Sequence, residues 1–98
     1  MVMRIIDLVR ACYTSSDGDV VREALLFHIR GNRSVVVSFA GIDTVTSSFV
    51  NSALVPLLDT MPLEEFKRRL RFVEVTHQIG DLIRSRLTQA SKRQHAAA

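Results

Sequence analysis

The sequence predicts a small α/β domain whose strands and helices follow the order βαβαβα. Three short apolar runs suited to strands alternate with three longer segments whose apolar residues recur at helical spacing. This alternation favours a mostly parallel sheet joined by right-handed crossovers. With 98 residues, the chain suits one domain, which we place at residues 1–95 with a basic tail from about residue 91. The terminal residues 96–98 (Ala-Ala-Ala) look like a cloning remnant.

The first strand is expected at Arg4–Val9, where the sequence reads RIIDLV. A polar transition follows, and around Ala11–Ser15 it offers room for a fourth, short antiparallel strand. The first helix is expected at Val20–Arg30, since an apolar stripe recurs there at helical spacing, and Gly31-Asn32 supplies the usual stop. Its candidate N-terminal caps are Ser15, Ser16 and Asp17.

The second strand, Val35–Phe39, carries apolar residues on both faces. We therefore expect a central strand that is covered on both sides. The next helix is expected to begin with Ser47 or Ser48 as its cap and to run to about Thr60. Pro56 lies inside this pattern, so it should kink the helix and leave one carbonyl, that of Ser52, without an intrahelical partner.

A short charged segment opened by Pro62 leads to the third strand, Arg69–Val75. The last helix is expected at Gln78–Ala90, with Thr76 as its cap. The predicted architecture is thus a three- to four-stranded, mostly parallel sheet packed by about three helices.

The net charge of +3 is unevenly distributed, because residues 62–98 hold eight Lys/Arg against four Asp/Glu. A basic C-terminal third is typical of a solvated helix surface, and it also suits contact with nucleic acid or an acidic protein. The candidate basic patch consists of Arg84, Arg86, Lys92 and Arg93. Aromatic residues are too few for a base-stacking surface, with one Tyr and no Trp, so nucleic acid is the second choice of partner.

Catalytic and cofactor signatures are missing from the sequence. The histidines His28, His77 and His95 fall on separate elements without metal-ligand spacing, and no glycine-rich phosphate loop precedes a helix. The single cysteine, Cys12, is best explained as a small packing residue in a reducing compartment. We expect a non-enzymatic, cytoplasmic protein without cofactor, metal or membrane span, since no apolar run approaches the roughly 20 residues that a span needs.

The most specific feature is a hydroxyl-rich junction between the second strand and the second helix. It follows Gly41 and contains Asp43, Thr44, Thr46, Ser47 and Ser48. Plain capping of the helix explains hydroxyls here, and Asp43 after glycine is typical of a turn. The alternative is a loop that docks a partner or accepts a phosphate, because a helix start tolerates negative charge.

This junction and its surroundings resemble the STAS-like domain family, a group of small bacterial domains of unknown function related in pattern to anti-sigma-factor antagonists. The strongest matching segments are VVVSFAGI, DTVTSSF and NSALVPLL within Ser34–Leu58. Tyr13-Thr14 with Gly18, and the segment FVEVTHQIGDLI, match more weakly. Together they cover most of residues 4–90.

The resemblance implies a protein-interaction domain whose partner is a GHKL-type ATPase or kinase, or a related regulator. In anti-sigma-factor antagonists a loop reading Asp-Ser-Ser-Gly carries the phosphorylated serine. Aligned here, Ser48 takes the acceptor position and Ser47 lies beside it, while Thr46 replaces the Asp and Phe49 replaces the Gly. The implied docking surface adds Asn51 and Ser52 to the loop. Self-association through a strand edge stays open.

Overall fold

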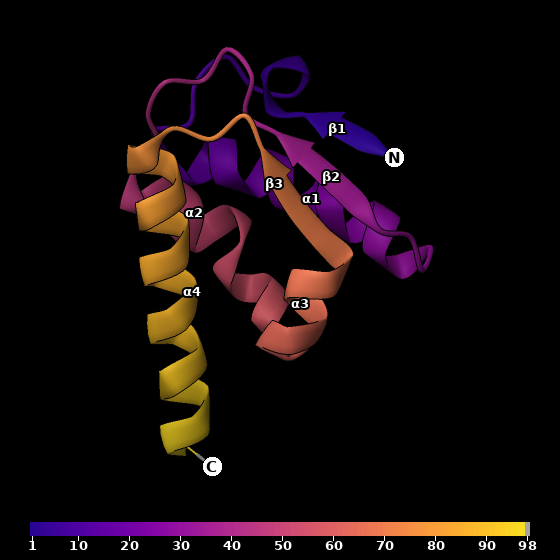
Figure 1. The fold of residues 1–98 in the computed structure, drawn as a ribbon, viewed down its shortest axis with the longest axis vertical. Coiled ribbons are helices and arrows are strands. Elements are labelled where there is room, and N and C mark those ends of the chain that lie inside the picture. Colours follow the sequence, from indigo (N-terminus) through magenta and orange to yellow (C-terminus); the bar gives the residue numbers. More distant parts are fainter. Residues whose placement is uncertain (98) are drawn as a thin grey trace.

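The α/β architecture is confirmed, with four α-helices beside a three-stranded parallel sheet (Figure 1). The structure is a computed structural model that describes residues 1–97, with side chains described to residue 92. The strands are β1 (Val2–Arg4), β2 (Val35–Ser38) and β3 (Leu70–Val73). The α-helices are α1 (Ser15–Arg30), α2 (Ser47–Ala53), α3 (Leu63–Arg69) and α4 (His77–Ala97). Two 3₁₀ helices are η1 (Ile5–Asp7) and η2 (Val55–Asp59).

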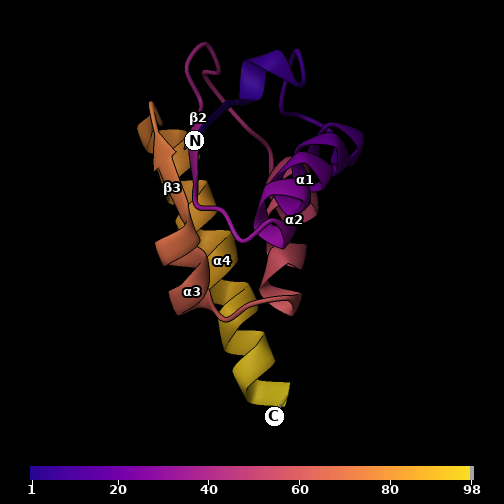
Figure 2. The same ribbon diagram turned by 90° about the vertical axis from the view of Figure 1, so that its right-hand side faces the viewer.

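The strands lie in the spatial order β1-β2-β3, so β2 is central as predicted. Two right-handed crossovers that step in the same direction place their helices on the same face of a sheet. Figure 2 shows this arrangement edge-on, with α1 and α2 on one side of β2 and β3. The prediction that β2 is covered on both sides is therefore wrong. In register with β2, the open face carries Val2, Arg4 and Arg71, all exposed.

The first strand ends where we expected it to begin. Pairing starts at the chain's first residue, whose carbonyl accepts the Val36 N–H at 2.8 Å. The chain then turns, because the N–H groups of Leu8 and Val9 return to the Ile5 carbonyl at 2.9 and 3.1 Å. Ile5 and Val9 are both buried, four residues apart, as a helical turn requires. Among the described residues no fourth strand forms around 11–15.

Helix α1 begins earlier than predicted because the cap is Thr14. The Thr14 hydroxyl accepts the Asp17 N–H at 3.1 Å, and the Asp17 carboxylate accepts the Thr14 N–H at 3.4 Å, which closes a capping box. The predicted stripe is buried through Val21, Leu25 and Ile29. The predicted stop also holds, since Gly31 caps the helix and Asn32 follows with a φ of 61°.

Pro56 divides the second predicted helix into α2 and η2. The α-helix ends at Ala53, and a 3₁₀ helix with the proline in its first turn continues to Asp59. The carbonyl of Ser52 loses its intrahelical partner, as predicted, and accepts the Arg22 Nη1 of α1 at 2.8 Å instead. The cap is Thr46 and not Ser47 or Ser48, because the Thr46 hydroxyl accepts the Phe49 N–H at 3.2 Å.

The last strand is shorter and the last helix longer than predicted. Arg69 still belongs to α3, and Glu74 leaves the strand with a φ of 57°. Thr76 caps α4 as predicted, with its hydroxyl accepting the Ile79 N–H at 3.2 Å. The helix continues beyond Ala90 to Ala97, so the predicted basic tail is helical there. No helix among the described residues is long and apolar enough to cross a membrane.

Candidate partner-docking site

The hydroxyl-rich junction lies at the carboxyl end of the sheet, where the loops after β1, β2 and β3 meet (Figure 1, top). Parallel strands deliver the N-termini of α1, α2 and α4 to this same edge. Ligands and partners of α/β proteins commonly bind at this edge, because its loops are free to vary. The predicted loop residues therefore lie where the fold places variable, accessible groups.

Helix α4 holds the loop in place through the side chain of Gln78. Its Oε1 accepts the Val45 N–H at 3.1 Å, and its Nε2 donates to the Val45 carbonyl at 2.9 Å. Thr76 adds a third contact, donating from its hydroxyl to the Asp43 carbonyl at 3.2 Å. Both polar groups of Val45 are thereby satisfied while its side chain is buried. This part of the loop is fixed, and the exposed side chains of Asp43 and Thr44 project from it.

Thr46 fixes the other end of the loop to the segment before α1. Its N–H donates to the Cys12 carbonyl at 3.1 Å, and its hydroxyl donates to the Tyr13 carbonyl at 2.7 Å. The same hydroxyl accepts the cap bond from Phe49. Thr46 is half-buried and fully engaged, so its role is to position the start of α2.

Ser47 and Ser48 both lie on the exposed side of this fixed helix start. The next residues, Phe49 and Val50, are 1% and 0% exposed and anchor the helix in the core. One turn later, Asn51 is exposed again. The structure thus brings Ser47, Ser48 and Asn51 together on the solvent side of α2, where the first turn contains no acidic residue.

Ser52 has a structural role in the contact between α2 and α1. Its hydroxyl bonds to the Ser15 carbonyl at 2.9 Å and to the carboxylate of Asp19. Arg22 pairs with the same carboxylate at 3.0 Å. The hydrogen bond from Ser52, together with the charge of Arg22, lowers the pKa of Asp19 below its usual value. Ser52, like Thr46, therefore contributes little to the free surface.

The predicted basic patch is divided between two sides of α4. Arg84 is exposed and pairs with Asp81 at 3.3 Å, and Lys92 is exposed two turns further along. Arg86 is half-buried, and its Nε is a buried atom without a hydrogen-bond partner among the described residues. The side chain of Arg93 lies outside the described residues. Arg84 and Lys92 share one face, and Arg86 does not belong to it.

Cys12 is fully buried and free. Burial, with a smaller contribution from the charge of Asp17, raises its thiol pKa to about 11. The reactive thiolate is accordingly scarce at neutral pH. Within the described residues, no three His, Cys, Asp or Glu side chains cluster as metal ligands would.

Sequence reasoning missed two residues of this site. The sequence predicts Gln78 only as a helix residue, and its link to the loop has no local signal because the partner lies 33 residues away. Tyr13 is 56% exposed, and its backbone carbonyl bonds to Thr46, so this exposed residue adjoins the junction. An exposed aromatic next to a fixed loop is a feature of protein-binding surfaces.

Replacing Gln78 by Ala is expected to loosen the loop without unfolding the domain. The change leaves both polar groups of Val45 without their partner, which costs about 1–3 kcal/mol. Amide hydrogen exchange should show faster exchange at Val45, with protection in β2 unchanged. Gln89→Ala, an exposed residue on the same helix, is the control. Equal exchange at Val45 in both variants would show that Gln78 does not hold the loop.

These features define a class of protein: a small domain with a parallel sheet wound in one direction and a hydroxyl-bearing loop–helix junction at its carboxyl edge. The chain belongs to the family described as a STAS-like domain of unknown function, whose model matches residues 17–85. The match includes the whole junction and all strands except β1. No curated protein and no solved structure matches the chain.

Proposed function

We propose that the protein is a non-enzymatic regulatory domain that binds a protein partner through the junction Asp43–Ser48 and the exposed side of α2. One observation carries the proposal: Ser47 and Ser48 are exposed on a helix start whose neighbours are tightly fixed. A fixed surface binds with little loss of conformational entropy. The exposed hydroxyls, Asn51 and the ring of Tyr13 give that surface both polar and aromatic contacts.

The same geometry supports control by phosphorylation of Ser48 or Ser47. A phosphate adds about −1.5 to −2 charges at pH 7. The first turn of α2 contains no acidic residue, so the added charge meets little repulsion within the domain. Its effect would fall on the bound partner, because a charge buried in an interface without a matching cation is unfavourable. Phosphorylation is thus expected to release the partner and leave the fold intact.

The two residues that differ from the antagonist motif have structural roles in this domain. Thr46, in place of the aspartate, caps α2 and bonds to the segment before α1. Phe49, in place of the glycine, is buried. Neither covers the serines, since Ser47 and Ser48 stay exposed. The proposed partner is a GHKL-type ATPase or kinase, or a related regulator, as in the related antagonists.

Ser48→Asp is expected to weaken binding to such a partner at least about tenfold, or 1.4 kcal/mol. Isothermal titration against the GHKL-type ATPase encoded nearest to this gene measures the effect. Ser85→Asp is the matched control, because Ser85 is an exposed serine on α4 away from the junction. Mass spectrometry after incubation with ATP locates the modified serine. Equal binding of both variants, with an unmodified junction, would end the proposal.

The nucleic-acid alternative receives less support from the charged surface. Arg84 is engaged with Asp81, and Arg86 is half-buried on another side of the helix. A nucleic-acid partner would bind with an affinity that falls steeply as salt rises, through counterion release. Retention on heparin or DNA that is lost in Lys92→Glu, but not in Ser48→Asp, would favour this alternative.

A further inference from the structure

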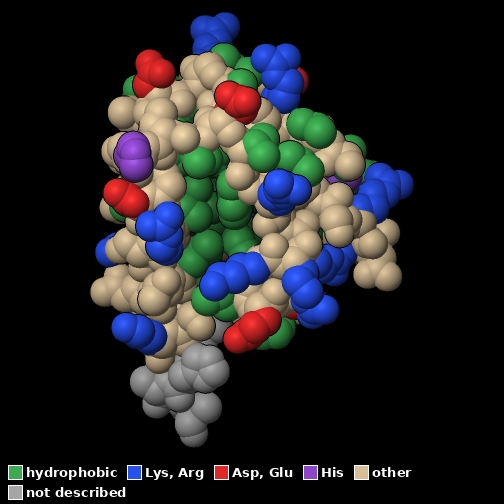
Figure 3. Space-filling view, in the orientation of Figure 1, with side chains coloured by type: hydrophobic (Ala, Val, Ile, Leu, Met, Phe, Trp, Pro, Cys, Tyr) green, Lys and Arg blue, Asp and Glu red, His purple; other side chains and the backbone are tan. Residues whose placement is uncertain are grey.

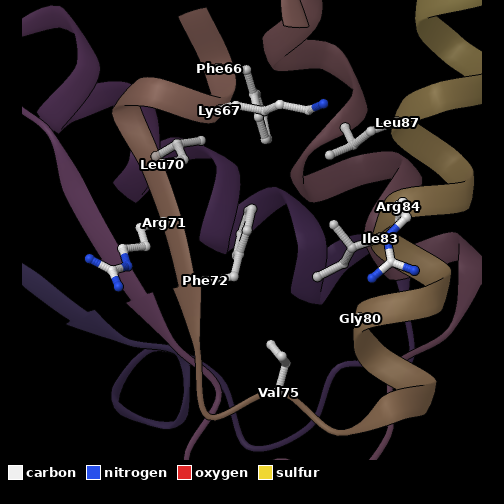
Figure 4. A pocket seen from close by; sticks show the side chains of 10 residues that line it. All are labelled: Phe66, Lys67, Leu70, Arg71, Phe72, Val75, Gly80, Ile83, Arg84 and Leu87. Carbon is white, nitrogen blue, oxygen red and sulfur yellow. The ribbon is translucent and has the colours of Figure 1, made fainter. Parts of the chain in front are cut away.

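A second surface of the molecule is an apolar groove between β3 and α4, closed at one end by α3. Its volume is about 370 Å³, within the range of binding sites. Figure 3 shows hydrophobic side chains in the hollow and Lys or Arg side chains on both sides of it. Phe72 points into the groove from β3, while Ile83 and Leu87 face it from α4 (Figure 4). None of these residues belongs to the junction described above.

The edge of β3 forms one wall of this groove. β3 is the last strand of the sheet, and the Phe39 N–H donates to the Val73 carbonyl at 3.1 Å. Successive residues of a strand direct their backbone groups to opposite sides. The N–H and carbonyl of Phe72 therefore face away from β2 and toward the groove. Among the described residues no strand pairs with that side, so this edge of β3 is available for strand addition.

The charged residues that line the groove are all positive. Its lining includes Lys67, Arg71 and Arg84 and no acidic residue. Lys67 reaches across one end toward α4, and Arg84 lies on the α4 side (Figure 4). Arg84 pairs with Asp81, but both side chains are largely exposed, at 76% and 70%. Such a pair is weak and easily exchanged for another carboxylate.

We propose that this groove binds an extended segment of a partner protein that adds to β3 as a fourth strand. The chemistry of this segment follows from the free edge of β3, the apolar side chains in the groove and the positive residues that line it. Backbone pairing with Phe72 requires an extended main chain, and side chains of a strand alternate between two faces. One set would pack on Phe72 and Ile83 and must be apolar. The other set would face the open side of the sheet, where Arg71 lies, and the ends of the segment would approach Lys67 and Arg84, so Asp or Glu is favoured at those positions.

Gly80 gives a test that spares the core. It lies on α4 at the groove, and a Cβ there meets only Val75 Cγ2, at 3.9 Å. Gly80→Leu should therefore fill the groove while the domain stays folded, and Gly80→Ala is the control that leaves it open. The charge is tested by Lys67→Glu with Arg84→Glu. The control for charge is Lys92→Glu, which is exposed on α4 outside the groove.

The probe is a fluorescein-labelled heptapeptide of alternating glutamate and valine, titrated by fluorescence anisotropy. We expect saturable binding that shifts the amide resonances of Phe72 and Val75. Binding should weaken at least about tenfold in Gly80→Leu and in the double charge variant. A peptide with lysine in place of glutamate, or with N-methylated amides, should bind at least about tenfold more weakly, since it lacks the charge or the donors.

Three results would overturn the proposal. The first is no binding of the peptide at millimolar concentration. The second is equal binding of the N-methylated peptide, or displacement of the labelled peptide by dodecanoate alone. Either would indicate an amphiphile site instead of strand addition. The third is a dimer in sedimentation that Gly80→Leu dissociates, which would make a second copy the occupant. None of these results bears on Ser48→Asp, so the two proposals fail separately.

Discussion

Gly18→Ala is expected to destabilise the domain by about 1–2 kcal/mol. Gly18 is buried where α1 crosses α2. A Cβ there would lie 2.7 Å from the Phe49 carbonyl oxygen, 2.7 Å from Ser52 Cβ and 3.0 Å from the Ala53 nitrogen. Backbone atoms cannot rotate away, so the two helices must separate. Overpacking costs about 1–3 kcal/mol and occasionally more, and the gain in helix propensity, about 1 kcal/mol at most, offsets only part of it.

Urea denaturation of Gly18→Ala beside Gly31→Ala measures this effect. Gly31 has a φ of −80°, and its nearest neighbour to a new Cβ is 3.5 Å away, so alanine fits there. Separation of α1 from α2 would also disturb the hydrogen bonds from Arg22 and Ser52. Gly18→Ala should therefore weaken partner binding as well. Stability equal to that of Gly31→Ala would show that the helices have room that the structure does not show.

Phe49→Ala is expected to cost about 3–5 kcal/mol of stability. The Phe49 side chain is 1% exposed and is among the largest buried side chains, and truncation of such a residue removes buried area and leaves a cavity. Small domains have only about 5–15 kcal/mol of stability in total. The substitution should also disturb the junction, because the N–H of Phe49 donates to the capping hydroxyl of Thr46.

The matched control is Phe27→Ala, the same change at a ring that is 69% exposed. It should alter the free energy of unfolding by less than about 1 kcal/mol. If both variants unfold at the same urea concentration, Phe49 does not anchor α2. A further variant tests the residue at which this chain differs from the antagonist motif. Glycine at this position would leave the cavity of the alanine variant and add backbone freedom, so Phe49→Gly should be less stable still.

The fold class could be predicted because it depends on local periodicity. The stripe Val21, Leu25 and Ile29 is buried as its spacing requires. A proline inside a helical pattern kinks or breaks the helix, and Pro56 follows the end of α2. Element ends were less predictable. Thr14 and Thr46 are the caps, while the neighbouring serines, which cap at least as well, lie within the helices. Which hydroxyl caps a helix depends on where the preceding chain enters it, and that entry is fixed by contacts with distant segments.

The candidate site, too, was predictable from the sequence only in part. The hydroxyl-rich junction was visible in the sequence, because strand, glycine turn and helix start follow one another along the chain. The sequence did not show that Gln78 holds the junction or that Tyr13 adjoins it, since both contacts join residues 33 positions apart. The role of Ser52 in holding Arg22 and Asp19 also depends on the crossing of α1 and α2.

By itself the sequence determined the alternation of strands and helices, the buried stripes and the chemistry of the junction. Tertiary structure alone decided which surfaces remain free. Strand order is set by long-range pairing, and the order β1-β2-β3 puts both crossovers on one face. That choice leaves the opposite face open and makes β3 an edge beside α4. The groove exists for this reason, because residues of β3 and α4 meet there only once the sheet has formed.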